Sequence, residues 1–575
     1  METKKCYQCQ KSFLIDSDEL GYYEKMGVQV PRLCPDCRSQ RRTLFRNERA
    51  FYKHKCDKCG KDSISMYSPD KTFPVYCYDC WFSEDWDGSS YAKEYDSSRP
   101  FFDQWKELFN TVPKPALVAM RSVNCHYLNF CADNKNCYMV VESSNNEDCT
   151  HCYWIQKTKN CIDTSYAHQT EFSYDTDDVY NSTRVFYSRG VYDCLDSYFL
   201  LHCRNCTDCI GCVNLRNQSN CIFNTQYTKE EYEKKKAELR LDTASGVEKF
   251  RKEFDEFKNT FPSKYAEIYN SVNSTGNYIT HAKNVQNCFH SYESEDCKHS
   301  IHVWRGVKDC MDCNTVGRAA EKIYNTLNTG LEGSNVICGF YCWSSNFVSY
   351  SFNCPNSTNL FGCVGMRKKS YAILNKTYEK DEYEKIKNHI IEELKNKGVY
   401  GEFFPAELSP FGYNETSAID EFPLTKAEAL AQGFRWEDYP RGTYDKGTIE
   451  WENVPDSIKE IGTIDAVKEI FTCTNCTKNY RIIDDELTFY SRLEIPLPRW
   501  CPECRFKRRV GGRNPHKLWK RSCSCAGNQS TNAKYKNTGT HFHVDSSCPN
   551  EFETSYAPNR PEIVYCEQCY QSEVV

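Results

Sequence analysis

A cysteine-paired module occurs twice in this 575-residue chain, once near each end. Each copy holds two Cys-x2-Cys pairs at the same separation, and the second pair reads Cys-Pro-x-Cys-Arg. Two such pairs, each held in its own small element, bring four thiolates tetrahedrally around Zn²⁺. The sequence therefore predicts two structural zinc sites, with the ligands Cys6, Cys9, Cys34 and Cys37 in the first copy and Cys473, Cys476, Cys501 and Cys504 in the second.

A further cysteine cluster follows each of these modules. The N-terminal one is formed by Cys56, Cys59, Cys77 and Cys80. Near the C-terminus, Cys548 precedes a last pair by the same distance that separates Cys59 from Cys77. For this fourth site we expect Cys525, Cys548, Cys566 and Cys569, with Cys523 or a histidine of the insertion that carries His541 and His543 as the competing ligand in place of Cys525. About four zinc ions are expected, because such short segments bury too little apolar surface to fold without metal.

Disulfides are the alternative interpretation of these cysteines, and they need an oxidising compartment. The first residues, Met1 to Cys6, contain no hydrophobic core of a secretory signal, and no stretch approaches the roughly 20 apolar residues of a membrane span. We therefore expect reduced thiols, a cytoplasmic location and no membrane partner.

Between the modules lies a repeat region in which a pair [Asn/Asp]-[Cys/Ser] returns at a fixed short step, as at Asn124-Cys125, Asn136-Cys137 and Asp148-Cys149. Such a period is typical of a solenoid, whose coils bury their inner faces by stacking. Asn and Asp tolerate the left-handed backbone of a corner, and Cys is a small hydrophobe that suits a tight interior. Whether one period makes a whole coil or one side of a coil twice as long is open at this point.

The predicted fold is mainly β with small α+β zinc modules: a two-lobed β-solenoid body, each lobe closed by a helix, flanked by duplicated treble-clef/zinc-ribbon pairs. The sequence around Gly211-Cys212-Val213 recurs around Gly362-Cys363-Val364, which indicates two related lobes. Thr228 with Glu231 forms a capping box before the first charged helix. The expected segments are zinc modules at 1–55, 56–95, 471–522 and 523–575, lobes at 116–228 and 276–378, charged helices at 229–262 and 379–398, and a linker with a short helix at 399–470.

Twenty of the 37 cysteines lie in the repeat region, and most follow its period, as buried ladder residues do. Cys203, Cys206, Cys209 and Cys212, spaced by three, are the exception, and metal binding there is left open. Asp163, Asp175, Asp177 and Asp178 fall at repeat corners, which favours a structural role over a catalytic one. Four protein ligands at each zinc leave no position for water, unlike a catalytic zinc. We expect no enzyme and no small-molecule substrate.

An arginine run follows the second cysteine pair of each duplicated module. The net charge of the chain is −6, yet residues 32–55 carry eight Lys/Arg against two acids, and residues 499–521 carry nine against one. Arginine pairs bidentately with phosphate, and nearby aromatic residues could stack on bases. The predicted nucleic-acid contacts are Arg38, Arg41, Arg42, Arg46, Arg505, Arg508, Arg509 and Arg513.

The Cys34-Pro-x-Cys37-Arg38 and Val564-Tyr565-Cys566 segments, with the repeat body closing at Asn214-Leu215-Arg216-Asn217, resemble uncharacterised multi-zinc, Cys-rich repeat proteins of candidate phyla radiation bacteria. The resemblance covers nearly the whole chain and implies the zinc modules and the repeat body, but no activity. The chain departs from the pattern at Met366-Arg367-Lys368 and at the Cys523/Cys525 pair.

The leading hypothesis is a non-enzymatic zinc-binding scaffold that binds RNA or a ribonucleoprotein through the two arginine arms. The alternative is a structural or protein-interaction scaffold, in which zinc serves only folding and the arms dock onto an acidic protein or onto the chain itself. A protein partner on the solenoid fits either hypothesis. A metal or thiol store is a third and weaker interpretation.

Overall fold

The computed structural model describes residues 2–329, 331–439, 442–544 and 546–575. It is mainly β and contains a β-solenoid of about 21 turns. Neighbouring strands pair in parallel with a register of one sequence period: Ser165 lies beside Asp177, and Thr207 beside Ser219. One period therefore makes one whole coil, which answers the question that the sequence left open.

Each coil has four corners, spaced by three positions. Positive φ angles occur at Asn124, Tyr127, Phe130, Asp133 and Asn136, and this step continues along the solenoid. The prediction that Asn and Asp lie at left-handed corners is confirmed, and their side chains stack, with Asn124 Nδ2 donating to Asn136 Oδ1 at 2.9 Å. Aromatic residues also lie at corners, because the coil imposes this backbone at every third position whatever the side chain.

The interior of the coils is filled by small apolar side chains, among them most of the cysteines. Cys149 is fully buried, and its Sγ donates to the carbonyl of Glu147 at 3.3 Å. Cys203, Cys206, Cys209 and Cys212 lie on the four sides of one coil, are all buried, and donate to carbonyls two positions back. These contacts favour a packing role for the repeat cysteines.

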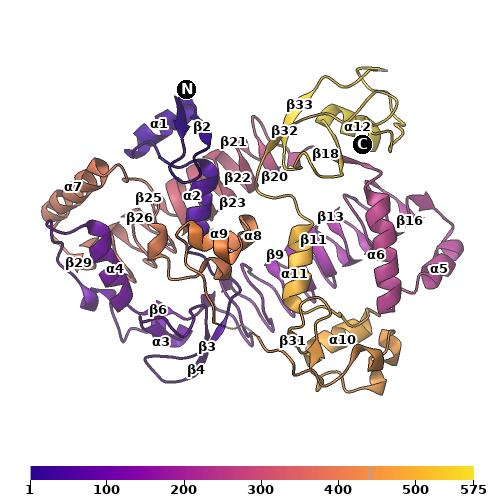
Figure 1. Cartoon of the computed structure of the whole chain (residues 1–575), viewed down its shortest axis with the longest axis horizontal. Coiled ribbons are helices and arrows are strands. Elements are labelled where there is room, and N and C mark those ends of the chain that lie inside the picture. Colours follow the sequence, from indigo (N-terminus) through magenta and orange to yellow (C-terminus); the bar gives the residue numbers. More distant parts are fainter. Residues whose placement is uncertain (1, 330, 440–441, 545) are drawn as a thin grey trace.

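The coils form two runs with separate, mainly parallel strand pairings; only the last strand of each run, β17 and β29, pairs antiparallel among the described strands (Figure 1). The strands of the first run are β7(Ala119–Met120), β8(Cys131–Ala132), β9(Tyr153–Gln156), β10(Ile162–His168), β11(Tyr174–Tyr180), β12(Thr183–Phe186), β13(Arg189–Tyr192), β14(Leu195–Tyr198), β15(Thr207–Ile210), β16(Ser219–Ile222) and β17(Thr225–Gln226). Those of the second are β19(Ile268–Tyr269), β20(Gly276–Thr280), β21(Lys283–Gln286), β22(Cys288–Lys298), β23(Ile301–Val316), β24(Glu321–Thr329), β25(Ser334–Ile337), β26(Asn346–Ser349), β27(Thr358–Phe361), β28(Ser370–Ile373) and β29(Lys376–Thr377).

The two runs contact each other side by side through rings at their corners. Phe130 stacks on Tyr341, Trp154 on His302 and Tyr166 on His290, with centroid distances of 5.2, 4.0 and 4.5 Å. Residue numbers rise along the first run while those of their partners fall along the second. The axes of the two runs are therefore antiparallel where they meet.

Helices cover the far end of each run. Where one charged helix was expected at 229–262, the structure has two, α5(Lys229–Glu238) and α6(Ala244–Lys258). The predicted capping box of Thr228 and Glu231 is confirmed at the start of α5. This helix packs on β16, and α7(Lys380–Asn396) packs on β28, so each covers a terminal coil. Such caps shield the apolar end of a solenoid from water.

The modules consist of short hairpins and helices around the cysteines. Their strands are β1(Glu2–Lys5), β2(Ser12–Ile15), β3(Tyr52–Lys55), β4(Asp62–Ser65), β5(Val75–Tyr76), β30(Phe471–Thr472), β31(Asn479–Tyr480), β32(Trp519–Ser522), β33(Glu551–Thr554) and β34(Ile563–Tyr565). Their helices are α1(Ser17–Met26), α2(Pro35–Thr43), α3(Tyr78–Phe82), α4(Phe101–Thr111), α10(Asp484–Arg492), α11(Pro502–Gly511) and α12(Glu567–Val574). β5 pairs with β6(Lys114–Pro115) and β34 with β18(Pro262–Lys264), so a module leads into the start of each run.

The linker from 399 to 470 contains α8(Ala418–Glu421) and α9(Lys426–Ala431). Thr425 and Glu428 form a capping box at the start of α9, and Phe434 stacks on Tyr413 with ring centroids 5.1 Å apart. Within the described ranges, no helix is both long and apolar enough to cross a membrane.

Candidate metal centres and the docked arginine helices

The sulfur atoms of three predicted clusters converge as expected. Within each of three clusters the four Sγ atoms lie within 4.8 Å of one another; the members are Cys6, Cys9, Cys34 and Cys37; Cys56, Cys59, Cys77 and Cys80; and Cys473, Cys476, Cys501 and Cys504. A tetrahedron with Zn–S bonds of about 2.3 Å has S···S edges of about 3.8 Å. The Cys9–Cys34, Cys59–Cys77 and Cys476–Cys501 distances are 3.7, 3.9 and 3.7 Å. These clusters fit a tetrahedral metal ion such as Zn²⁺, and all 37 cysteines are free of disulfides.

Local backbone geometry prepares each cluster. In the first module the N–H of Cys34 donates to Cys6 Sγ at 3.3 Å, and in the third Cys501 donates to Cys473 Sγ at 3.2 Å. α2 and α11 begin directly after these cysteines, with proline at the first helical position, where its missing N–H costs nothing. Each cluster therefore fixes the start and direction of the helix that carries the arginine run.

The fourth cluster corrects one ligand of the sequence assignment. The structure groups Cys523, rather than Cys525, with Cys548, Cys566 and Cys569. The N–H of Cys566 donates to Cys523 Sγ at 3.2 Å, as Cys34 does to Cys6. The insertion thus lies inside the first pair of this module, between Cys523 and Cys548, where the other modules have a simple Cys-x2-Cys. Because the insertion interrupts this pair, the sequence favoured Cys525 and left Cys523 as the competing ligand.

The arginines of α2 point into the second coil run. Arg38 Nε lies 2.9 Å from Asp312 Oδ2, and Arg42 Nη1 lies 3.7 Å from Asp312 Oδ1. Arg42, which is fully buried, also donates to the side-chain oxygens of Asn314 at 2.7 Å and Asn325 at 3.0 Å. These polar groups come from β23 and β24 of the solenoid.

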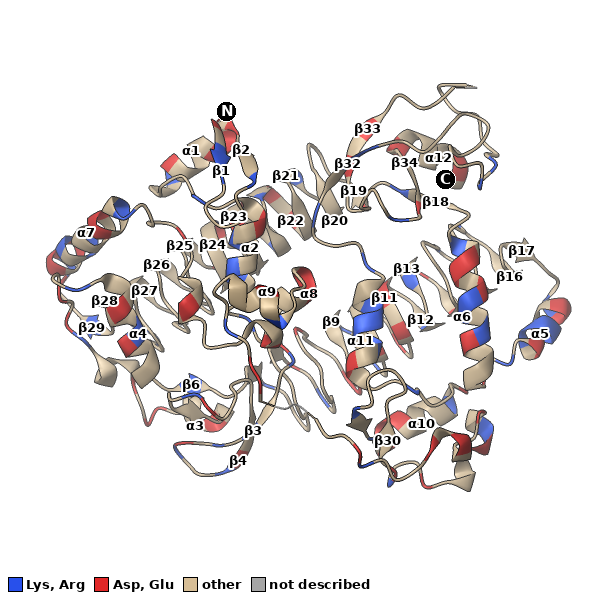
Figure 2. Ribbon diagram, viewed as in Figure 1, with Lys and Arg blue, Asp and Glu red and all other residues tan. Residues whose placement is uncertain are grey.

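The arginines of α11 bind the first coil run in the same way, and Figure 2 shows this basic helix beside β11. Arg505 Nε lies 2.7 Å from Asp163 Oδ2, and Arg509 Nη1 lies 3.0 Å from Asp163 Oδ1. Arg508 Nη2 reaches Asp175 Oδ2 at 2.6 Å. Asp163 is fully buried, so these carboxylates serve the docking of α11.

Arg46 and Arg513 each contact both coil runs. Arg46 pairs with Glu48 and with Glu142 of the first run, and it donates to Thr315 Oγ1 of the second at 3.0 Å. Arg513 lies 3.3 Å from Asp177 and 2.7 Å from His290 Nε2 of the second run. Its guanidinium is 3.4 Å from the centroid of Tyr166.

The match between helix and solenoid follows from their repeats. Residues four apart on a helix are about 6 Å apart along its axis, and successive coils are about 4.8 Å apart. In α11, Arg509 thereby reaches both Asp163 and Asp175, which lie on successive coils. In α2, Arg38 and Arg42 share Asp312.

All eight arginines expected to contact nucleic acid thus contact the chain itself. Six of them, at positions 38, 42, 46, 505, 509 and 513, are at most 9% exposed. Arg41 is partly exposed and pairs with Glu402 at 3.3 Å. Phe45 and Phe506, two aromatic residues near the arginine runs, are buried as well. The corner acids Asp163 and Asp175, for which a structural role was expected, are the partners of Arg505 and Arg508.

Burial and the docked arginines shift the pKa values of these acids in opposite directions. Burial alone raises the pKa of Asp175, but Arg508, Arg251 and Arg509 outweigh it and hold the pKa below its ordinary value. Burial raises the pKa of Glu142 to about 8, and the nearby charge of Glu48 acts in the same direction. Arg46 opposes this shift. Burial and the neighbouring charge of Asp177 raise the pKa of Asp178 to about 7.

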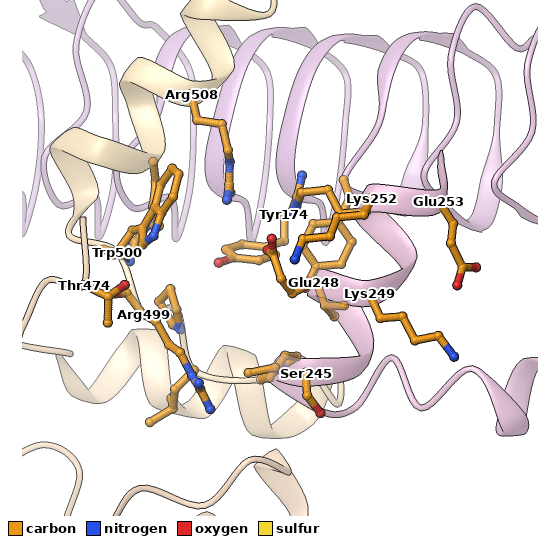
Figure 3. A pocket seen from close by; sticks show the side chains of 18 residues that line it. Tyr174, Ser245, Glu248, Lys249, Lys252, Glu253, Thr474, Arg499, Trp500 and Arg508 are labelled. Atoms are coloured by element: carbon orange, nitrogen blue, oxygen red, sulfur yellow. Dashed lines mark hydrogen bonds between the residues drawn. The ribbon is translucent and has the colours of Figure 1, made fainter. Parts of the chain in front are cut away.

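A cavity of about 650 Å³ lies between α6, the first coil run and the third module (Figure 3). Tyr174, Trp500 and Arg508 face it, and Lys249, Lys252 and Arg499 give it a basic lining. Arg499 pairs with Asp456 at 3.0 Å and Arg508 with Asp175, so these cations already have acidic partners. The lining combines cations, rings and the carboxylates of Glu248 and Glu253, and within the described part of the chain it contains no cysteine or histidine.

Comparisons with known proteins give no identity. No protein-family model matches the chain, and no curated protein matches it. One solved structure, described as the polySia specific acetyltransferase NeuO, aligns over 44% of this chain and 79% of its own, with 9% identity and a TM-score of 0.06. At that score the alignment carries no argument about fold or function.

Proposed function

We propose that this protein is a non-enzymatic scaffold in which bound zinc folds the terminal modules and the arginine helices fasten these modules to the solenoid. In this proposal the two coil runs are two lobes, and the modules are of the treble-clef type. The observation that carries it is the burial of six arginines against acids of the coils. The zinc then acts as a structural ion that sets the helix direction.

RNA binding through the arginine helices is the competing hypothesis. A phosphate would have to displace carboxylates such as Asp163 and Asp312, which are fully buried. Removing one partner of a buried ion pair costs about 3–5 kcal/mol, because the other charge is left uncompensated. The arms therefore fit docking onto the chain itself better than docking onto nucleic acid.

Three further expectations belong to the proposal. Clusters with four protein ligands leave no open position on the metal, which favours a structural over a catalytic role. Thiolate clusters persist under reducing conditions, which favours the cytoplasm. The outer faces of the coils remain for a protein partner, and the inward-facing repeat cysteines fit packing better than thiol storage.

The test is binding of total cellular RNA to the purified full chain across a salt series. The diagnostic variant combines Arg41→Glu with Arg508→Glu, the two least buried of the eight, and the control combines Lys234→Glu with Lys380→Glu on exposed helix faces. We expect no binding that depends on Arg41 and Arg508. A log–log salt slope of roughly −0.7 per phosphate contact, reduced in the diagnostic variant alone, would overturn the proposal.

A further inference from the structure

The insertion inside the fourth module carries a second set of ligand atoms. Cys525, His541, His543 and Cys569 each contribute one atom, and these four atoms lie within 4.8 Å of one another. Cys569 also belongs to the cluster with Cys523, Cys548 and Cys566. Two candidate metal positions therefore meet at one sulfur atom.

The distances in the second set fit a tetrahedral ion. With Zn–S of about 2.3 Å and Zn–N of about 2.0–2.1 Å, a tetrahedral S···N edge is about 3.5 Å. Cys525 Sγ lies 3.5 Å from His541 Nδ1, and His543 Nε2 lies 3.4 Å from Cys569 Sγ. On the other side of the shared sulfur, Cys569 and Cys548 are 3.7 Å apart.

Each histidine has a partner on its remaining ring nitrogen. His541 Nε2 lies 2.8 Å from Glu573 Oε1, and His543 Nδ1 lies 2.6 Å from the carbonyl of Ser546. Metal-bound histidines almost always donate their second N–H to a carboxylate or carbonyl, which fixes the ring and the tautomer. Both imidazoles thus turn the nitrogen without such a partner toward the sulfurs, as ligands do.

We propose that the fourth module holds two zinc ions that share the thiolate of Cys569. One ion takes Cys523, Cys548, Cys566 and Cys569, and the other takes Cys525, His541, His543 and Cys569. Sharing gives two closed tetrahedra with five thiolates and two neutral imidazoles. It also leaves a net charge of −1 on the pair, less than the −2 of a single four-cysteine site.

The second ion explains how the insertion folds. Between Cys525 and His541 the chain is mostly polar, with Tyr535 as its one large ring, so little apolar surface is available for burial. Its contacts to the module include Glu573, which accepts from the N–H groups of Thr538 and Gly539 at 2.9 Å each, and Tyr565, whose hydroxyl donates to Asn537 Oδ1 at 2.7 Å. Metal binding supplies the folding energy that such a segment lacks.

The experiment measures zinc per chain by native mass spectrometry on the full-length protein purified with zinc under reducing conditions. We expect Cys525→Ser and His543→Ala each to lose one zinc relative to the wild type. His543→Cys restores a ligand and should keep the wild-type count, as should the control His389→Ala on the exposed face of α7. An unchanged count in both Cys525→Ser and His543→Ala would overturn the second site.

Sharing is tested separately by exchanging zinc for ¹¹³Cd in the wild type. A thiolate that bridges two ions transmits a ¹¹³Cd–¹¹³Cd scalar coupling. We therefore expect two of the cadmium resonances to be coupled to each other, and we expect both to be lost in Cys569→Ser. Two uncoupled resonances would overturn the shared thiolate. Neither measurement depends on RNA binding, so the scaffold proposal and the two-metal proposal can fail independently.

Discussion

At the scale of single residues, corner positions of the solenoid carry the acidic side chains that bind the arginine helices. Asp163, Asp175 and Asp178 have φ between 52° and 54°, a conformation that Asp tolerates better than most residues. The coil places these carboxylates in columns, and the docked helices supply the countercharge. The same corner geometry thus serves the backbone turn and the binding of the modules.

The pKa of Asp178, raised to about 7 by burial and by Asp177 despite Arg513, gives a signed pH dependence. The folded state holds this proton more tightly than the unfolded state, so the contribution to stability is present at low pH and is lost as pH rises from about 4 through 7. Asp178→Asn should remove this loss, which is at most about 1.4 kcal/mol per pH unit. Urea midpoints at pH 5.5 and pH 8 measure it. A wild type and a variant with equal pH dependence would contradict the assignment.

The corner at Asn136 gives a second prediction. Its φ is 52°, and its amide donates to Asp148 while accepting from Asn124. Asn136→Val forces a β-branched residue into the left-handed region and should cost about 1–3 kcal/mol in the free energy of unfolding. Asn136→Gly removes the ladder but keeps the backbone free, so its cost should be smaller. Urea unfolding ranks the two variants, and the reverse order would refute the corner argument.

At the scale of elements, each arginine helix depends on the metal cluster that precedes it, and its ion pairs depend on the position of the helix. We call each cluster with its helix an arm. The cluster fixes Cys34 and Cys501, these residues start α2 and α11, and the helices carry the arginines to the coils. The coils depend on their own ladders of parallel hydrogen bonds. Stability should therefore differ between arms and coils.

Removing the metal should separate these two levels of stability. A zinc chelator under reducing conditions is expected to raise amide hydrogen exchange in α1, α2, α10 and α11, because metal supplies the folding energy of the modules. Strands β22 to β24 should keep most of their protection. Mass spectrometry of peptic fragments reads both regions. Equal loss in arms and coils would mean that the metal also supports the solenoid.

Much of the fold could be predicted from the sequence because its signals are periodic. The regular step of the Asn-Cys pairs predicts the coil, and the Cys-x2-Cys pairs predict the members of three clusters. The role of Arg38 and Arg505 could not be predicted, because their partners Asp312 and Asp163 are far away in the sequence and only folding brings them together. The choice between Cys523 and Cys525 stayed open for a different reason, since an insertion interrupts the first cysteine pair of the fourth module.

At the scale of the whole molecule, each duplicated zinc module docks onto the coil run that lies farther from it in the sequence. The first module binds the second coil run through Arg38 and Asp312, and the third module binds the first run through Arg505 and Asp163. Further pairs repeat this relation, such as Glu19 with His299 and Glu486 with His151. Distant parts of the chain are thereby joined into one body with both termini on the same side in Figure 1.

The central claim is that the arginine helices are internal fasteners, and a double-mutant cycle on Arg505 and Asp163 tests it most directly. We expect Arg505→Ala and Asp163→Ala each to lower the free energy of unfolding by about 3–5 kcal/mol, with a coupling energy of about 0.5–3 kcal/mol or more. The exposed pair Arg121 and Asp133, 2.7 Å apart, is the control and should couple by about 0–1 kcal/mol. Single costs and a coupling no larger than those of the control would contradict the account.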